Sequence, residues 1–236
     1  MQRIILLVIL LSNLNNSFSQ KTVADLLKSG NEKQAAHQLK EAITDFSDAL
    51  KLEPGNTDAY YFRANAYFGL KEFKPAINDY TECLKYKPNH IDALYNRANA
   101  YYETEEFEKA IDDFTATLKL DSTFADSYFD RGNTYYKIGK NKEAISDITH
   151  GLRLKPDNAD GYYDRANAKF QLNAYNEAVS DYSKAIELSP NINDYYFNRA
   201  IAEFNLEMNA EGCRDLEKAK ELGDSEAKDY QKEFCK

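Results

Sequence analysis

Arginine and aspartate residues recur in this sequence at a fixed spacing and could together form charged sites. An arginine returns every 34 residues, and an aspartate follows each arginine 16 residues later. The arginines are Arg63, Arg97, Arg131, Arg165 and Arg199, and the aspartates are Asp79, Asp113, Asp147, Asp181 and Asp215. A row of guanidinium groups could bind an anion, but a carboxylate at the same period would neutralise each guanidinium locally. We therefore predict structural ion pairs, because a buried charge must be paired.

A series of asparagines follows the arginines by two residues. Its members are Asn65, Asn99, Asn133 and Asn167, and Ile201 breaks the series at the next position. Aromatic residues stand four positions before the asparagines and therefore share their helical face. These aromatic residues are Tyr61, Tyr95, Phe129 and Tyr163. We predict a surface rich in amides and aromatic rings. Two roles stay open for the asparagines: contact with a partner, or hydrogen bonds to the neighbouring structural unit.

Residues of the usual catalytic and metal-binding kinds do not gather anywhere in the sequence. His37, His90 and His150 are far apart and share no recurrent spacing to carboxylates or cysteines, which argues against a metal site or a histidine-based catalytic group. The sequence contains no glycine-rich phosphate loop, no G-x-S-x-G and no H-E-x-x-H. We therefore predict no catalytic residue, no metal and no cofactor.

Two of the three cysteines could form a disulfide. Cys213 and Cys235 are nearly equidistant from Gly223-Asp224, which joins two segments with helical patterns. Antiparallel packing of those helices would bring the two cysteines together, and in an oxidising compartment a disulfide would fix the last helix as a cap. Free thiols remain the alternative, because periodicity does not set sulfur geometry. Cys83 takes a position held elsewhere by alanine, so we expect a small buried residue.

The composition is that of a soluble globular protein. The chain has 236 residues, of which 43% are hydrophobic and 29% charged, enough to form a substantial core. The formal net charge of -9 opposes nucleic-acid binding, because contacts with phosphates need clustered lysine and arginine.

The series described above belong to a repeat of 34 residues that runs through six copies. In each copy a small residue is followed four positions later by a large, mostly aromatic or aliphatic residue. The small residues are Ala42, Ala76, Ala110, Ala144, Ala178 and Gly212, and the large residues are Phe46, Tyr80, Phe114, Ile148, Tyr182 and Leu216. A period of this length indicates stacked supersecondary units.

Each copy has the pattern of two helices. In Asp92–Thr104 and again in Phe107–Leu120, large apolar residues fall at helical intervals. The small residue lets the helices approach closely, and a proline after the second helix in most copies prevents its continuation. Arg63 and Asp79 lie equally far from the turn near Lys71, so antiparallel helices would bring them together. We predict an all-α fold, a right-handed α-solenoid of six helix-turn-helix units with a C-terminal capping helix.

The fourth copy carries the residues by which the chain resembles the tetratricopeptide repeat. They are Tyr128, Gly132, Tyr135, Ala144 and Pro156. The resemblance divides residues 20–226 into six units, 23–56, 57–90, 91–124, 125–158, 159–192 and 193–226, and leaves 227–236 as the end of the capping helix. Tyrosine or phenylalanine replaces the family's usual tryptophan, arginine replaces its usual leucine, and Ser122 and Asp224 stand where proline is expected.

The resemblance also implies a binding surface. In tetratricopeptide-repeat proteins the first helix of each hairpin lines the concave surface, where asparagine ladders can hold the backbone of an extended peptide. It thus implies a partner-binding groove formed by Tyr61, Asn65, Tyr95, Asn99, Phe129, Asn133, Tyr163 and Asn167. The basic residues with which family members clamp a C-terminal carboxylate are absent, and aspartates stand near the start of each first helix instead. These are Asp92, Asp126, Asp160 and Asp194.

The N-terminus has the pattern of an export signal. Arg3 precedes an apolar run from Ile4 to Leu11, and a polar stretch with Ser17 and Ser19 follows it. The run is too short to span a bilayer, so we expect residues 1–19 to form a cleavable signal peptide. The polar end resembles signal peptides of Gram-negative bacteria, which implies a periplasmic or secreted protein with no membrane insertion of the mature chain.

These observations favour a non-catalytic protein that binds an extended protein or peptide segment, as an adaptor or assembly factor of the cell envelope. Two alternatives stay open. The chain could be a self-associating envelope scaffold that uses its convex face, or it could bind carbohydrate through its tyrosines and asparagines. The sequence does not determine the partner, the pathway or the oligomeric state.

Overall fold

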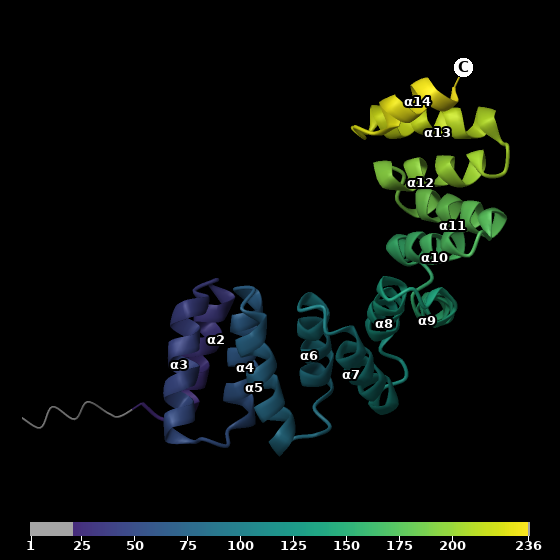
Figure 1. Cartoon of the computed structure of the whole chain (residues 1–236). Helices are drawn as coiled ribbons and strands as arrows, with labels where there is room; N and C mark the ends of the chain where they lie inside the picture. The colour runs from purple at the N-terminus through teal and green to yellow at the C-terminus, as the bar shows by residue number, and fades with distance from the viewer. Residues whose placement is uncertain (1–20, 236) are drawn as a thin grey trace, which may run out of the picture. The chain divides into compact units, whose positions relative to one another are not determined.

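The computed structural model of the protein describes residues 21–235, and every regular element in this range is an α-helix (Figure 1). The predicted signal peptide, 1–19, lies outside the described residues. Contacts divide the chain into two compact parts, Met1–Lys87 and Pro88–Lys236. Each part is described by itself.

The first part contains two helix hairpins. Its helices are α2 (Val23–Ala35), α3 (Leu39–Leu52), α4 (Thr57–Gly69) and α5 (Phe73–Tyr86). Helix α2 packs on α3, α4 packs on α5, and α3 joins the two hairpins by packing on α4.

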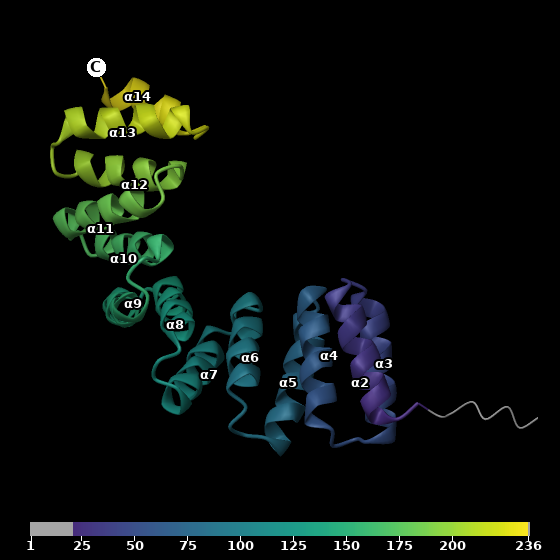
Figure 2. The same ribbon diagram turned by 180° about the vertical axis from the view of Figure 1, so that it is seen from behind.

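The second part contains four more hairpins and a last short helix. Its helices are α6 (Ile91–Glu103), α7 (Phe107–Leu120), α8 (Ala125–Lys137), α9 (Asn141–Leu154), α10 (Ala159–Gln171), α11 (Tyr175–Leu188), α12 (Asn193–Phe204), α13 (Asn209–Glu221) and α14 (Ala227–Phe234). Each odd-numbered helix from α7 to α11 packs both on its own partner and on the first helix of the next hairpin. Figure 2 shows this stacking from behind, with α14 lying on α13 at the C-terminal end.

The turn inside each hairpin places one residue in the left-handed region. These residues recur with the 34-residue period and have φ near 60°, or 75° at the glycine: His37, Lys71, Glu105, Gly139, Asn173 and Glu207. In the second hairpin the Glu72 amide donates to the Tyr67 carbonyl at 2.9 Å and the Lys71 amide donates to the Phe68 carbonyl at 2.8 Å. This pair of bonds is a Schellman motif, which satisfies carbonyls at the helix end and reverses the chain.

The core of every hairpin consists of the small and large residues of the sequence repeat. Ala42, Ala76, Ala110, Ala144 and Ala178 are fully buried, and the large residues that follow them are at most 1% exposed. A small residue is equally necessary in the first helix of the hairpin, where it faces the large residue of the second helix. A Cβ added to Gly132 would lie 2.6 Å from Cγ1 of Ile148, so the two helices touch at a glycine there.

The predicted fold class is therefore confirmed as an all-α array of helix-turn-helix units with a C-terminal helix. Helix boundaries differ from the predicted ones by a residue or two. The segment predicted as Asp92–Thr104 is the helix Ile91–Glu103, and Phe107–Leu120 is a helix with those same bounds.

Candidate functional site

Each arginine of the repeat forms a two-bonded ion pair with the aspartate of its own hairpin. In the fourth hairpin, Nε of Arg131 donates to Oδ2 of Asp147 at 2.6 Å and Nη2 donates to Oδ1 at 2.8 Å. The same two bonds join Arg63 to Asp79, Arg97 to Asp113, Arg165 to Asp181 and Arg199 to Asp215. The aspartates are 7% exposed or less, so the pairs lie between packed helices and are not presented to an anion.

The arginines also connect successive hairpins. Nη1 of Arg131 donates to the Thr115 hydroxyl of the preceding hairpin at 2.9 Å, and its guanidinium lies 6.0 Å from the ring centre of Tyr135. Burial would lower the pKa of Arg131, but the hydrogen bond and charge of Asp147 outweigh burial and raise it. The guanidinium therefore keeps its charge and uses its donors within the fold.

The last hairpin departs from this scheme at Glu203. The position four residues after the arginine holds Tyr101 or Tyr135, whose rings face the arginine, or Lys169, which bonds Asp181 at 2.6 Å. Glu203 is 5% exposed, its Oε1 is 3.9 Å from Arg199, and its Oε2 has no hydrogen-bond partner. Burial, followed by the charge of Asp215, raises the pKa of Glu203 to about 7.

Glu203 should make the free energy of unfolding depend on pH in an unusual way. Because its pKa is raised from an ordinary 4.5 to about 7, the folded chain holds a proton between these values that the unfolded chain has lost. The free energy of unfolding should fall by about 2–3 kcal/mol across this window as pH rises. Urea unfolding of Glu203→Gln at pH 4 and pH 8 should lack that fall.

Comparing the variant with wild type separates the contribution of Glu203 to the pH dependence from that of other groups that titrate in the same range. The charged groups acting on it, Arg199, Asp215, Glu211 and Arg214, are unchanged in the variant. Equal pH slopes in the two proteins would show that Glu203 does not carry the effect.

The asparagine series does not form a uniform ladder in the structure. Oδ1 of Asn65 accepts a hydrogen bond from the Tyr80 hydroxyl at 2.6 Å, and Oδ1 of Asn167 accepts one from the Tyr182 hydroxyl at 2.7 Å. Each of these bonds joins the two helices of a single hairpin, α4 to α5 and α10 to α11. These two asparagines therefore use their oxygens within their own hairpin, and not on the neighbouring unit as the structural alternative expected.

The other two asparagines face an open hollow because their hairpins lack that tyrosine. The residue 15 positions after Asn99 is Phe114, and the one after Asn133 is Ile148, neither of which has a hydroxyl to donate. Asn133 instead donates from Nδ2 to Oδ2 of Asp164 in the next hairpin at 2.9 Å. Asn99 lies close enough to Tyr95, four residues earlier on the same helix, to lower the pKa of its hydroxyl, although burial raises that pKa overall.

Two adjoining hollows in the second part of the chain form what we call the central groove. The first, of about 200 Å³, is lined by Asn99, Tyr102, Glu103, Asp130 and Asn133. The second, of about 210 Å³, is lined by Tyr95, Asp126, Phe129, Asp130, Asn133, Asn158, Asp160, Gly161 and Asp164. Asp130 and Asn133 belong to both, so the two hollows are neighbours along α6, α8 and α10, the first helices of three hairpins.

Two carboxylates of the central groove are held by neutral groups only. Asp130 accepts from the Tyr95 hydroxyl at 2.6 Å, and Asp164 accepts from Asn133. Within residues 21–235 no lysine or arginine forms an ion pair with either carboxylate. Burial raises the pKa of both groups, that of Asp164 to about 6. The groove can thus offer negative charge and amide groups to a ligand.

Asp130 and Asp164 are groove residues that we did not predict from the sequence. They stand immediately before the arginines, where the other copies have Phe62, Asn96 and Asn198. Aligning the copies on the arginine shows that the residue before it varies within an otherwise regular repeat. That variation could have indicated Asp130 and Asp164.

The predicted groove aromatics have different roles. Tyr95 and Tyr163 use their hydroxyls on the groove face, where Asn198 donates to the Tyr163 oxygen at 2.8 Å. Tyr61 packs its ring against Tyr80 with centres 6.2 Å apart. Phe129 lines the second hollow, as predicted, but only 7% of it is exposed. Its ring packs over Gly151 and Gly161, which leave the space that it fills.

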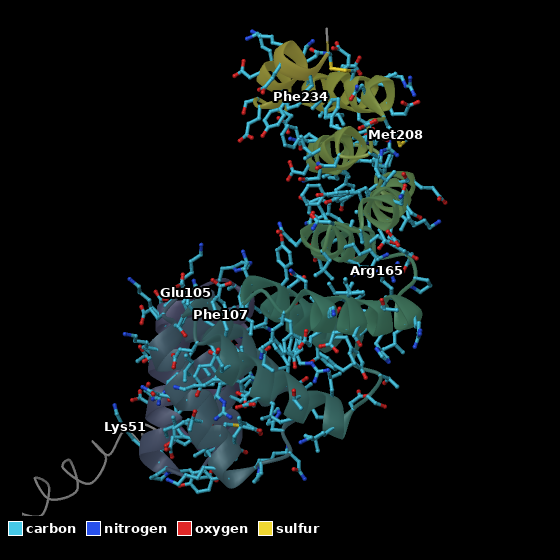
Figure 3. All side chains as sticks on the ribbon, turned by 45° about the vertical axis from the view of Figure 1, so that its right-hand side comes forward. Lys51, Glu105, Phe107, Arg165, Met208 and Phe234 are labelled. Atoms are coloured by element: carbon cyan, nitrogen blue, oxygen red, sulfur yellow. A yellow bond between two sulfur atoms is a disulfide. The ribbon has the colours of Figure 1, made fainter. Side chains whose placement is uncertain are left out.

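At the C-terminal end, a disulfide joins Cys213 to Cys235, with a Cα–Cα distance of 5.7 Å. It appears as a yellow bond near Phe234 in Figure 3. Cys83 is buried, and burial raises its pKa to about 11, so it is a poor nucleophile.

The histidines lie at separate places. His37 occupies a turn, His90 caps α6 by accepting from the Ala93 amide, and His150 stacks on Tyr128. No group of three possible metal ligands occurs in residues 21–235, and no helix there is long and apolar enough to cross a membrane.

Paired helices at a 34-residue period, with a polar groove along the first helices, define an α-helical repeat protein. Profiles of the family match most of the second part: "TPR repeat" at residues 98–139 and "Tetratricopeptide repeat" at 125–158 and 159–192. The profile "Anaphase-promoting complex, cyclosome, subunit 3" matches residues 35–117. The chain belongs to the tetratricopeptide-repeat family, whose arrays are protein-interaction modules.

Solved structures of the same family have the same fold. YrrB, "a TPR protein with an unusual peptide-binding site", is 20% identical, with a TM-score of 0.70 over 80% of this chain and 97% of that chain. The C-terminal part of a TPR repeat-containing protein from Cytophaga hutchinsonii is 21% identical, with a TM-score of 0.74 over 83% and 78%. MamA is 22% identical, with a TM-score of 0.69 over 71% and 92%. No curated protein matches the sequence.

Proposed function

We propose that this protein holds an extended, positively charged segment of another protein in the central groove and does so without catalysis. The carrying observation is the pair Asp130 and Asp164, two carboxylates of the central groove that form no ion pair within the described residues. Lys155 and Lys137 act on them through their charge alone. A lysine or arginine of a bound segment would supply the missing partner. Asn99 and Asn133 would bond the backbone of that segment, because each amide offers both a donor and an acceptor.

The surroundings of the groove support a cationic partner. Asp126 and Asp160 also line the groove, and the lysine that forms an ion pair there, Lys155, bonds Asp126 at 2.6 Å and not the inner carboxylates. The formal net charge of -9 would further attract a basic segment over distances of about a Debye length. The similarity of fold to YrrB, which has a peptide-binding site, is consistent with this proposal.

We also propose that the protein acts outside the cytoplasm, as an adaptor or assembly factor of the cell envelope. The export pattern of residues 1–19 and the disulfide Cys213–Cys235 support this, because structural disulfides persist in oxidising compartments. Mass spectrometry of the protein from its native cells would test it. We expect an N-terminus that begins near Gln20, and an intact Met1 in the cytoplasmic fraction would refute it.

Affinity capture from the envelope fraction tests the groove. The variant Asp130→Asn/Asp164→Asn removes two carboxylates from the groove and keeps their shape. A matched control, Asp112→Asn/Asp157→Asn, removes two exposed carboxylates elsewhere. We expect the groove variant to retain specific partners roughly a hundredfold less or weaker still, since two charge-assisted bonds are lost and each contributes about 1.5–3 kcal/mol. Retention by wild type should also decrease with salt.

The outcomes separate the proposal from its alternatives. If all three proteins capture the same partners equally, the central groove is not the binding site, and attention moves to the convex face. If the control loses partners as the groove variant does, the interaction depends on net charge and not on a site.

A further inference from the structure

The chain has a second hollow on the same series of first helices, and its chemistry is different. Where the asparagine series ends, Ile201 of α12 stands in place of the amide. It lines a hollow of about 260 Å³ together with Phe204, Asn205, Tyr230 and Phe234. We call this hollow the terminal pocket. Apart from one amide and the tyrosine hydroxyl, its lining is aliphatic or aromatic.

Helix α14 builds one wall of the terminal pocket. The rings of Phe204 and Phe234 stack with centres 5.0 Å apart, and Tyr230 and Phe234 lie 5.9 Å apart. The disulfide to Cys235, next to Phe234, ties this wall to α13 (Figure 3). The pocket is therefore held in place by covalent and aromatic contacts before any ligand binds.

A helix that only closed the array would present polar residues to solvent. Lys228, Asp229, Lys232 and Glu233 of α14 do so. Phe234 does not, because it remains 44% exposed beside the opening of the pocket. An engineered cavity of about 150 Å³ binds benzene in another protein, so the terminal pocket has room for one large apolar side chain.

An acidic hollow adjoins the terminal pocket. It measures about 370 Å³, and its wall includes Asp194, Phe197, Asp224 and Glu226. Phe197 of this hollow and Tyr230 of the terminal pocket are in contact, and their rings meet edge to face with centres 5.1 Å apart. No lysine or arginine lines either hollow. The charge around the pocket is thus the same as in the central groove.

We propose that the terminal pocket takes a phenylalanine or leucine-like side chain of the bound segment, next to a lysine or arginine that lies over Asp194 and Asp224. This inference rests on the proposed function and deepens it by naming the sequence class of the partner: an extended segment in which an apolar residue adjoins basic ones. The apolar side chain anchors the segment, and the basic residues fix its direction and continue toward the central groove.

The test uses synthetic peptides and the disulfide-bonded chain. The probes are fluorescein-labelled GSKKFSG and GSFKKSG, and in matched probes serine replaces phenylalanine or glutamate replaces lysine. Fluorescence anisotropy measures binding to wild type and to two pocket variants, Ile201→Asn and Phe234→Ser. The first restores the amide of the other copies, and the second replaces an exposed side chain. Leu154→Ser is the control, because Leu154 is 42% exposed on a second helix far from the pocket in sequence. Circular dichroism checks that each variant is folded.

We expect the phenylalanine probes to bind both pocket variants at least fivefold more weakly than wild type. Their affinity for the control variant should equal that for wild type. The serine probes should not distinguish the variants from wild type. Equal binding of phenylalanine and serine probes, or pocket variants that bind like wild type, would overturn the inference. So would wild type that binds none of the probes. If Asp130→Asn/Asp164→Asn weakens binding while the pocket variants do not, the proposed function stands and the terminal pocket alone fails.

Discussion

Replacing Asp147 with alanine should lower the free energy of unfolding by about 3–5 kcal/mol, one of the two largest effects we predict for this chain. Asp147 is 7% exposed and accepts two hydrogen bonds from Arg131, whose side chain is 16% exposed. The substitution leaves a guanidinium between packed helices with only the Thr115 hydroxyl as a polar partner. Chemical unfolding followed by far-ultraviolet circular dichroism measures the loss.

A double variant separates the cost of the orphaned charge from the value of the pair. In Arg131→Leu/Asp147→Leu both charges are replaced by apolar groups, which is often close to neutral for a buried pair. We expect the double variant to be more stable than Asp147→Ala alone. If the single variant loses less than about 1 kcal/mol, the guanidinium reaches water and the pair is not structural.

The fold followed from the sequence because one pattern repeats without interruption. The positions of Ala144 and Ile148 recur in every copy, and each copy can bury its apolar face only by pairing two helices and stacking on its neighbours. The turns were less visible. His37, Lys71 and Glu105 adopt left-handed backbone conformations although glycine is the residue that favours them, so the turn is imposed by the helices on either side.

The site could be predicted only in part, because its polar contacts depend on pairs of positions and not on single series. Whether an asparagine faces the groove depends on the residue 15 positions later. Tyr80 and Tyr182 satisfy the oxygens of Asn65 and Asn167, whereas Phe114 has no hydroxyl for Asn99. A pattern analysis of one series treats the four asparagines as equal. The structure separates them by the hydrogen bonds that each second helix can donate.

The terminal pocket was out of reach for a different reason. Ile201 was visible as a break in the asparagine series, but a break alone does not indicate a cavity. The pocket exists because α14 brings Phe234 against Phe204 of α12 and Tyr230 against Phe197. The disulfide to Cys213 also ties α14 to α13, and its formation was left open by the sequence.

Removing the disulfide should therefore release α14 from the rest of the chain. The helix has only eight residues and one buried residue, Ala227, so it is too short to be stable without tertiary contacts. Cys213 and Cys235 close a loop with a sequence separation of 22, for which chain-entropy estimates give a stabilisation of about 3 kcal/mol. We expect Cys213→Ser/Cys235→Ser to show fast hydrogen exchange in α14, while α8 and α9 keep the protection of wild type.

The third cysteine provides the matched control. Cys83 is free and buried at a position where other copies have Ala49 and Ala185, so Cys83→Ala should change stability little and leave exchange in α14 as in wild type. Protection of α14 that survives loss of the disulfide would show that the apolar cluster of Ala200, Leu216, Ala219 and Ala227 holds the helix by itself. If protection is lost, one wall of the terminal pocket is lost with it. Reduction of the disulfide should then weaken the binding of the phenylalanine probes and leave the binding of the serine probes unchanged, because only the apolar anchor depends on α14.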